Sequence, residues 1–142
     1  MYKKILVAYD GSSYSDVALR QGAELARLCD SELHLVGIVS TTAYMALAEG
    51  AGSIDIWGME RDKLEAALES AVQDLADQGL KPIASVREGN PADEIAASAL
   101  DLRADLVVVG HTDKGAIARW FEGSVGAGLI RDLPCNLLVA TS

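Results

Sequence analysis

The chain has 142 residues, of which 50% are hydrophobic and 23% are charged, and its formal net charge is −9. This length and balance indicate one globular domain over residues 1–142, large enough to bury a substantial core. The negative charge disfavours binding to nucleic acid or to an anionic membrane, because the long-range field of the protein repels both.

The apolar runs and the two cysteines both bear on the cellular compartment of the protein. The apolar run at residues 5–8 is too short for a signal peptide, and no run approaches the roughly 20 residues of a membrane span. Cys29 and Cys135 lack the spacing of a metal site and are interpreted as reduced, small core residues. We therefore expect a cytoplasmic protein without membrane insertion.

The chain begins with a predicted strand and helix. An apolar run at residues 5–9 stops at a turn cluster that starts with Asp10-Gly11, as expected where a buried strand ends. Ser13 and Asp16 have capping-box spacing, which predicts that the helix starts at about Ser13. Its inner face is predicted from helical spacing to hold Val17, Ala18, Leu25, Leu28 and Cys29.

Residues 33–39 predict a second strand, in which we identify no titratable neighbour for His34. The next segment, 40–58, fits either a loop over a binding site or a surface excursion packed nearby. A helix over about residues 59–78 follows, with Gly79 as its C′ residue. The inner stripe of this helix is predicted to consist of Leu64, Ala67, Leu68, Ala71, Val72 and Leu75.

The rest of the chain continues the alternation of strand and helix. Residues 83–86 predict a third strand, and Asn90 as N-cap with Pro91 as first helical residue begins the next helix. Ile95, Ala99 and Leu102 are predicted to face inward. Residues 106–109 form a fourth buried strand. A last helix is predicted from Ser124 to near Asp132, before a fifth strand made of Leu137, Leu138, Val139 and Ala140.

Strict alternation of strands and helices favours a parallel sheet with helices on both faces. We therefore expect a three-layer α/β/α sandwich of the Rossmann-like or flavodoxin-like kind. Ligands of such sheets bind at the carboxyl ends of the strands, which directs attention to the loop after residue 109. That loop is not a P-loop, because Ala116-Ile117 replaces the required Lys-Ser/Thr after Gly110 and Gly115.

Three stretches give the sequence its resemblance to a known family. They are Ile5-Leu6-Val7-Ala8-Tyr9-Asp10-Gly11-Ser12, Gly89-Asn90-Pro91 and Leu133-Pro134-Cys135-Asn136-Leu137-Leu138-Val139. With these stretches the whole chain resembles the universal stress proteins. The resemblance implies an adenine nucleotide alpha hydrolase-like fold, with five parallel strands in the order 3-2-1-4-5.

ATP-binding members of that family carry Gly-x2-Gly-x9-Gly-Ser/Thr after the fourth strand. Gly110 matches the first glycine and Gly123-Ser124 matches the last pair, but Asp113 occupies the position of the middle glycine. A carboxylate about 4 Å from phosphate oxygens costs roughly 1 to 4 kcal/mol, depending on the effective dielectric. Gly115 can restore flexibility to the loop, Lys114 and Arg119 can offset the charge, and a metal ion such as Mg²⁺ can bridge Asp113 and the phosphate.

The same resemblance implies a nucleotide site at the carboxyl ends of the first and fourth strands. Asp10 would lie near the adenine and ribose, Ile38 against the adenine, and Val109 and Gly110 beside the ribose. Gly123, Ser124 and Val125 would hold phosphates through main-chain N–H groups and a hydroxyl. The remaining candidates at this edge are Ala8, Tyr9, Thr112, Asp113 and Gly115. Simpler structural roles remain open, because Asp10 can merely cap a helix and Ser124 can be merely an N-cap.

The leading interpretation is a small cytoplasmic regulator of the stress response that binds ATP or AMP. No nucleophile–base pair or metal cluster is recognisable, so we expect no enzyme beyond slow, incidental ATP hydrolysis. One alternative is a dimeric interaction module whose phosphate site is impaired by Asp113. Another is an enzyme that cleaves the α-phosphate bond, which the lack of a Ser-Gly-Gly loop after the first strand disfavours.

A homodimer is expected in either case. The last strand, residues 137–140, is predicted at an edge of the sheet, and an exposed apolar edge invites pairing. Two copies that pair along this edge would cover it, as edges of this kind do in the family.

Overall fold

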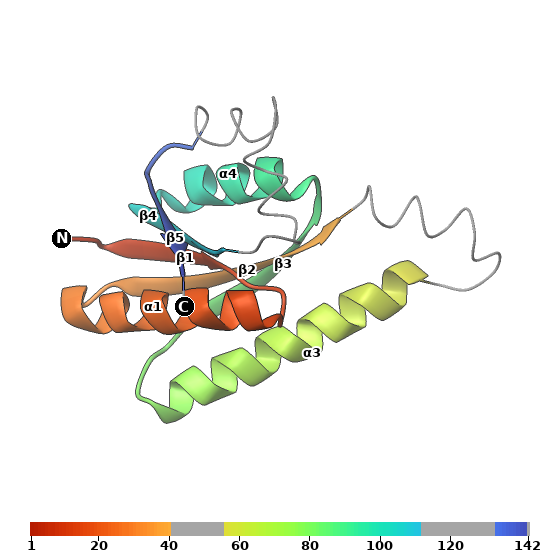
Figure 1. The fold of residues 1–142 in the computed structure, drawn as a ribbon, viewed down its shortest axis with the longest axis horizontal. Helices are drawn as coiled ribbons and strands as arrows, with labels where there is room; N and C mark the ends of the chain where they lie inside the picture. The colour runs from red at the N-terminus through yellow and green to blue at the C-terminus, as the bar shows by residue number, and fades with distance from the viewer. Residues whose placement is uncertain (41–55, 112–132, 142) are drawn as a thin grey trace.

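The computed structural model describes residues 1–40, 56–111 and 133–141, and Figure 1 shows their arrangement. The elements in chain order are β1 (Lys4–Ala8), α1 (Ser13–Cys29), β2 (Glu32–Ser40), α3 (Ile56–Asp77), β3 (Ile83–Gly89), α4 (Pro91–Leu102), β4 (Leu106–Gly110) and β5 (Asn136–Ala140). The strands form one parallel sheet in the order β3-β2-β1-β4-β5, which confirms the predicted fold and strand order.

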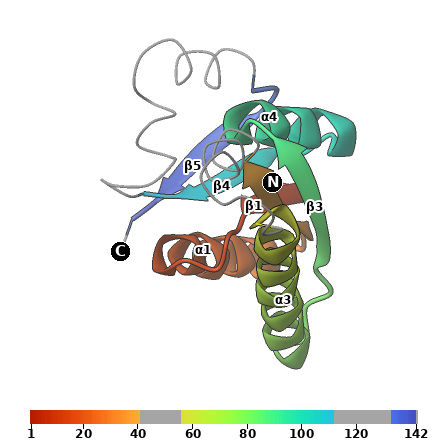
Figure 2. The ribbon, with the colours of Figure 1, turned by 90° about the vertical axis from the view of Figure 1, so that its right-hand side faces the viewer.

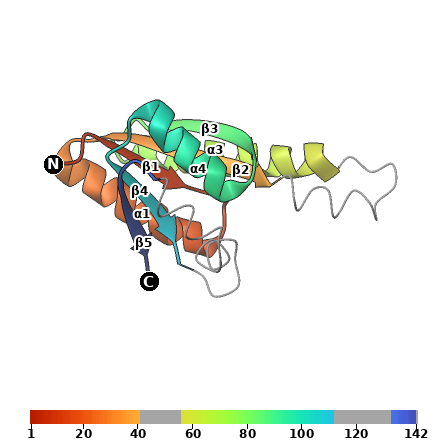
Figure 3. The same ribbon diagram turned by 90° about the horizontal axis from the view of Figure 1, so that it is seen from above.

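The helices divide between the two faces of the sheet. Helices α1 and α3 cover one face and α4 covers the other, as Figure 2 shows from the end of the molecule. Seen from above, α4 lies over the sheet and α1 lies beneath it (Figure 3). The described residues therefore form the expected three layers.

Strand β1 shows how the sequence fills both layers of the core. Ile5, Leu6 and Val7 are 0 to 1% exposed. Successive side chains of a strand point to opposite faces. Ile5 and Val7 accordingly join the core under α1 and α3, whereas Leu6 joins the core under α4. An unbroken apolar run is what a strand buried on both faces requires.

Helix α1 begins where predicted, but its N-cap differs from the prediction. Ser12, not Ser13, has extended backbone angles, and its hydroxyl accepts a hydrogen bond from the N–H of Ser15 at 3.3 Å. Gly11 precedes it with φ +84°, a left-handed conformation that favours glycine. The N-cap thus lies one residue earlier than the capping-box spacing indicated, directly after the tight turn at Gly11.

The centre of the inner face of α1 is made of small residues, and the predicted Val17 and Leu25 are partly buried against the same core. Its buried residues are Ser15, Ala18, Gly22, Ala23 and Ala26. Leu28, which was predicted to face inward, is 77% exposed, because it lies two residues, about 200°, from Ala26 around the helix. A Cβ on Gly22 would meet Val7 at 2.6 Å, so the small residues let α1 pack closely against β1.

Helix α3 follows its prediction closely. Leu64, Leu68, Ala71 and Leu75 are all buried, and Gly79 has φ +87° just after the helix. The helix packs over Gly37 of β2, where a Cβ would lie only 2.9 Å from the side chain of Leu64. Gly37 therefore makes room for the leucine that anchors α3 to the sheet.

Strand β3 is longer than predicted. It continues from residue 86 to Gly89, and Arg87 within it binds across to α4. The Arg87 guanidinium donates to Glu94 at 2.8 Å and to Asp101 at 3.2 Å, and these bonds raise the pKa of Arg87. Helix α4 has the predicted cap, since Asn90 accepts from the N–H of Asp93 at 3.2 Å.

The prediction that His34 lacks a titratable neighbour is wrong. His34 of β2 is 7% exposed, and its Nε2 lies 2.8 Å from Oε1 of Glu32. Residues two apart on a strand share a face, so this pair follows directly from the strand geometry. A buried polar ring requires such a partner.

Both cysteines are free thiols that are half-buried, so the core role predicted for them is confirmed only in part. Cys135 packs against the core under α4. Burial, together with the negative charge of Asp105, raises the pKa of Cys135. Its thiol therefore stays protonated at neutral pH. No helix in the described part of the chain has the length and apolar character needed to cross a membrane.

Candidate functional site

The two central strands β1 and β4 end side by side at the carboxyl edge of the sheet. They are direct neighbours in the sheet, with Val7 paired to Val108. Helix α1 leaves β1 toward one face, while α4 leads into β4 from the other face (Figure 2). This is the reversal point of strand order at which ligands of open α/β sheets bind.

Tyr9 continues the end of β1 and is fixed at both of its ends. Its main-chain N–H donates to the carbonyl oxygen of Val36 at 2.9 Å. Its hydroxyl donates to Oδ1 of Asp16, in the first turn of α1, at 3.0 Å. Partial burial and the hydrogen bond to the Asp16 carboxylate raise the pKa of Tyr9 to about 12. The ring is therefore neutral and held in place at physiological pH.

Asp10 is exposed at the start of the loop after β1. Its Oδ1 accepts a hydrogen bond from the N–H of Ser12 at 2.9 Å. Its own N–H donates to the hydroxyl of Ser15 at 3.3 Å. Asp10 thus closes the turn that precedes α1, whereas Ser12 caps the helix. Asp10 therefore has a structural role, but it stabilises the turn before α1 and does not cap the helix.

Gly110 ends β4 directly against the start of α1. A Cβ on Gly110 would lie 2.2 Å from the carbonyl oxygen of Tyr14 and 3.2 Å from the main-chain nitrogen of Ser15. No side chain fits in that space, since real Cβ contacts do not approach so closely. Gly110 is therefore required by the packing of α1 on β4, whatever else it does. The next residue, His111, is exposed, and its N–H donates to the carbonyl oxygen of Ala140 at 2.9 Å.

Three apolar candidates lie on the α4 side of this edge. Ala8 and Ile38 are half-buried and pack against the core under α4, and Val109 is fully buried in that core. Ile38 lies two residues past Val36, the register partner of Ala8, so it extends beyond the end of β1. Ala8 and Ile38 thus border the edge, while the side chain of Val109 belongs to the interior.

The structure brings the described candidates together at one edge. They are Ala8, Tyr9, Asp10, Ile38, Val109 and Gly110. The other candidates, Thr112, Asp113, Gly115, Gly123, Ser124 and Val125, lie outside the described residues, as do the predicted last helix and most of the 40–58 segment. Within the described residues, no group of three or more His, Cys, Asp or Glu side chains is placed to hold a metal ion.

Fold and edge together define a Rossmann-like α/β protein with a candidate site at the switch point between β1 and β4. The sequence matches the universal stress protein family over residues 1–141, and the chain belongs to that family. Universal stress protein MJ0531 of Methanocaldococcus jannaschii is 31% identical over 140 residues, which are 98% of this chain and 82% of that protein.

Solved structures show the same fold. The structure of hypothetical protein MJ0577 superposes with a TM-score of 0.80, at 23% identity, and covers 100% of this chain and 97% of the other. Two further structures contain nucleotides. One is a universal stress protein in complex with cAMP, at a TM-score of 0.61 and 24% identity over 98% of this chain and 96% of the other. The second, from Archaeoglobus fulgidus in complex with dAMP, has a TM-score of 0.66 and 22% identity, covering 98% of both chains.

Proposed function

We propose that this chain is a cytoplasmic, single-domain regulator that binds an adenine nucleotide, ATP or AMP, at the carboxyl edge of β1 and β4. The observation that carries the proposal is the switch point itself, where β1 and β4 end side by side with their helices on opposite faces. Crevices at such points are the usual nucleotide sites of open α/β sheets. The complexes of structural relatives with cAMP and dAMP support the same ligand class.

The side chains at the end of β1 suit the nucleoside half of such a ligand. The Asp10 carboxylate is exposed and uses Oδ1 for the N–H of Ser12. A carboxylate can accept several hydrogen bonds at once, and ribose hydroxyls and the adenine amino group are donors. Ala8 and Ile38 provide half-buried apolar surface beside it for a purine ring. Asp10 and Asp16 would repel phosphates, so the phosphates would extend toward β4 and away from α1.

On this proposal the phosphates would lie against main-chain N–H groups around Gly123, Ser124 and Val125, with Thr112, Asp113 and Gly115 in the loop between. Amides at a helix start favour anions. A Mg²⁺ ion would offset the repulsion between the Asp113 carboxylate and the phosphates. The proposal includes no catalytic residue, so hydrolysis would be slow and incidental.

Calorimetric titration tests the nucleotide claim. Nucleotide-free protein at high micromolar concentration is titrated with AMP, and with ATP in the presence and absence of Mg²⁺. We expect saturable binding that Asp10→Asn weakens, because the amide replaces an acceptor oxygen with a donor. Asp101→Asn, a change of the same type on α4, is the matched control and should bind like the wild type. Absence of heat with every nucleotide would remove the claim.

A second candidate is a dimeric interaction module that binds no nucleotide. It is favoured by the packing role of Gly110, which explains that glycine without any phosphate, and by the half-buried Leu137, Leu138 and Val139 on the edge strand β5. Pairing of two copies along this edge would cover those side chains.

Replacing Asp113 by glycine separates the two candidates. If the wild type binds no nucleotide and Asp113→Gly does, the site has decayed and the interaction module is the better description. If the wild type already binds tightly, the decayed-site reading is wrong. Sedimentation of wild type and Leu138→Lys tests the dimer, which a charge on the β5 edge should dissociate.

A further inference from the structure

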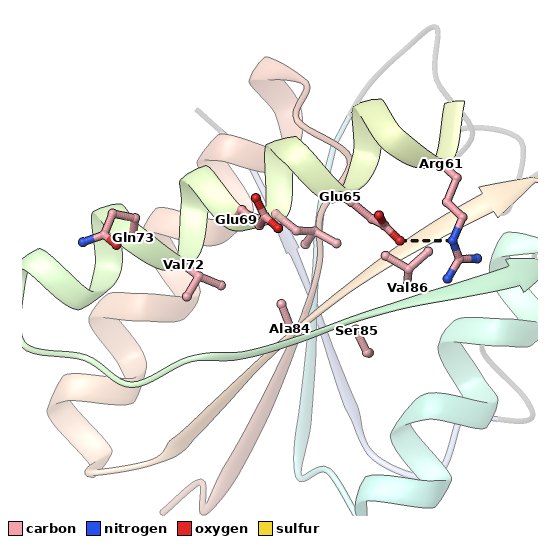
Figure 4. Close-up of a pocket in the computed structure, with 9 residues that line it drawn as sticks. Arg61, Glu65, Glu69, Val72, Gln73, Ala84, Ser85 and Val86 are labelled. Atoms are coloured by element: carbon pink, nitrogen blue, oxygen red, sulfur yellow. Dashed lines mark hydrogen bonds and ion pairs between the residues drawn. The ribbon is translucent and has the colours of Figure 1, made fainter. Parts of the chain in front are cut away.

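The opposite edge of the sheet carries a groove that the nucleotide proposal does not use. The groove has a volume of about 520 Å³ and lies between α3 and β3 (Figure 4). Strand β3 ends the sheet and pairs only with β2 among the described residues. Its first three residues are exposed, and Ile83 is 52% exposed. An edge strand of this kind presents main-chain groups that an added strand can pair with.

The walls of the groove combine an apolar floor with a polar rim. Leu68 is 3% exposed, Val72 is half-buried, and both line the groove from α3. In Figure 4 Ala84 and Val86 point from β3 toward α3, whereas Ser85 points away. Alternate residues of β3 therefore face the groove, which is the spacing at which a neighbouring strand would present its own side chains.

The rim of the groove carries an excess of negative charge. Residues 61, 65, 69 and 73 follow one another at four-residue intervals, so they form one row along α3. Arg61 donates to Glu65 at 3.1 Å and to Glu88 of β3 at 2.5 Å. Its positive charge is therefore already paired with two carboxylates. Glu69 has no ion pair with any described residue. The groove is thus lined by two carboxylates and one guanidinium, and that guanidinium is also paired with Glu88 outside the lining.

We propose that the groove and the outer edge of β3 bind an extended basic segment of another protein. The segment adds a strand to the sheet, places alternate apolar side chains over Leu68 and Val86, and places Lys or Arg beside Glu69. Main-chain pairing with a free edge and pockets for alternate side chains are the established physics of strand addition. A second copy of this chain that paired through the same edge is disfavoured as the occupant, because it would bring the same acidic rim against this one.

The test uses fluorescein-labelled peptides and the full chain. The probe is a peptide of alternating valine and lysine about eight residues long, within the usual length of a strand. Its counterpart alternates valine and glutamate. We expect anisotropy to report saturable binding of the lysine peptide and none of the glutamate peptide. Hydrogen exchange should slow at the amides of β3 when the lysine peptide is present, because pairing at the edge protects them.

Two pairs of variants locate the binding site. Glu69→Lys should weaken binding at least about fivefold, while Glu60→Lys, the same change at an exposed residue of α3 that does not line the groove, should leave it within about twofold. Ala84→Trp should weaken binding by filling the groove without a change of charge. Ala66→Trp, at an exposed position of α3 outside the groove, is its control.

Three results would overturn the proposal. Equal weakening by Glu69→Lys and Glu60→Lys would mean nonspecific attraction to an acidic protein. Unchanged exchange at β3 would rule out strand addition. Sedimentation showing self-association that Ala84→Trp abolishes would make the groove an interface between copies of this chain. Circular dichroism of each variant confirms that the fold is retained before any of these results is counted.

Discussion

Gly110 lies so close to the carbonyl oxygen of Tyr14 that a Cβ at position 110 would approach it within 2.2 Å. The contact joins the end of β4 to the first turn of α1. It lies beside the candidate nucleotide site, and the atoms that a Cβ would meet are all main-chain atoms. Any side chain at position 110 would therefore force β4 and α1 apart.

The first prediction is that Gly110→Ala destabilises the protein in the absence of any ligand. The added methyl group overlaps main-chain atoms that cannot rotate away, so we expect a cost of about 1–3 kcal/mol, typical of overpacking, or more. Urea denaturation of nucleotide-free protein measures it. The control is Gly79→Ala, where nothing lies within 4 Å and only the positive φ opposes the change. A Gly110→Ala variant as stable as wild type would show that this contact is not tight.

The second prediction compares Ser12 and Ser13 as the N-cap of α1. Ser12→Ala removes the N-cap oxygen of α1 and should cost about 1 kcal/mol of unfolding free energy. Ser13→Ala, an adjacent change that leaves the cap intact, should stay within about 0.5 kcal/mol of wild type. Parallel urea curves provide both values. Equal losses from the two variants would contradict the assignment of Ser12 as the cap.

The third prediction concerns the titration of Tyr9. Burial, aided by the Asp16 carboxylate, raises its pKa from 10.0 to about 12, so folding favours the neutral phenol. The stability that this shift contributes is complete below pH 10 and is lost as the pH rises through about 12. Ultraviolet absorbance of the phenolate should show one late-titrating tyrosine that Tyr9→Phe removes. In Asp16→Asn that tyrosine should titrate earlier, though burial still delays it. A late step that persists in Tyr9→Phe would assign it to another residue.

The fourth prediction concerns acid stability. The Asp105 carboxylate accepts hydrogen bonds from the N–H groups of Lys4 and Lys3, both at 2.8 Å, and these bonds lower its pKa below 3.8. A lowered carboxyl pKa contributes stability above the unfolded value that is lost as the pH falls through the folded value. Asp105→Asn should therefore be less stable than wild type at pH 7, and the difference should shrink below pH 4.

Thermal unfolding across that pH range measures the effect. Asp101→Asn removes a carboxylate of α4 that pairs with Arg87 instead of the start of β1, and it serves as the comparison. A difference between wild type and Asp105→Asn that stays constant from pH 7 to pH 3 would mean that the charge of Asp105 plays no part.

The layered fold could be predicted because each central strand is recognisable from its own consecutive residues. The apolar run of β4 is buried throughout and that of β1 is buried at Ile5, Leu6 and Val7, so the sequence alone identifies both strands. The same holds for α4, whose cap residues Asn90 and Pro91 stand next to each other. The end of β3 was missed because Arg87 and Glu88 break the apolar pattern. They are tolerated there because β3 is an edge strand and its charges pair with residues of neighbouring helices.

The sequence predicts which residues meet at the site only where their positions follow from the order of the strands and helices. The convergence of Asp10, Ile38 and Gly110 at one edge follows from the parallel topology, which the alternation of elements revealed. The packing role of Gly110 was not predictable, because the atoms it meets belong to a helix far away in the sequence. Likewise, no local pattern shows that α3 and β3 enclose a groove, because the width of the groove depends on the distance and angle at which α3 packs on the sheet.

The pairing of β1 with β4 also determines when this protein can fold. The bond between Lys4 and Asp105 spans 101 residues, and Ile5 lies opposite Leu106 in the central pair of strands. Closing so long a loop is entropically costly and slows folding. On the ribosome, β1 and β2 emerge early, but the flank of β1 that β4 will cover stays open until most of the chain has been synthesised. For that interval the nascent chain exposes an apolar edge that is fully covered in the finished molecule, and transiently exposed edges of this kind are where aggregation during synthesis begins.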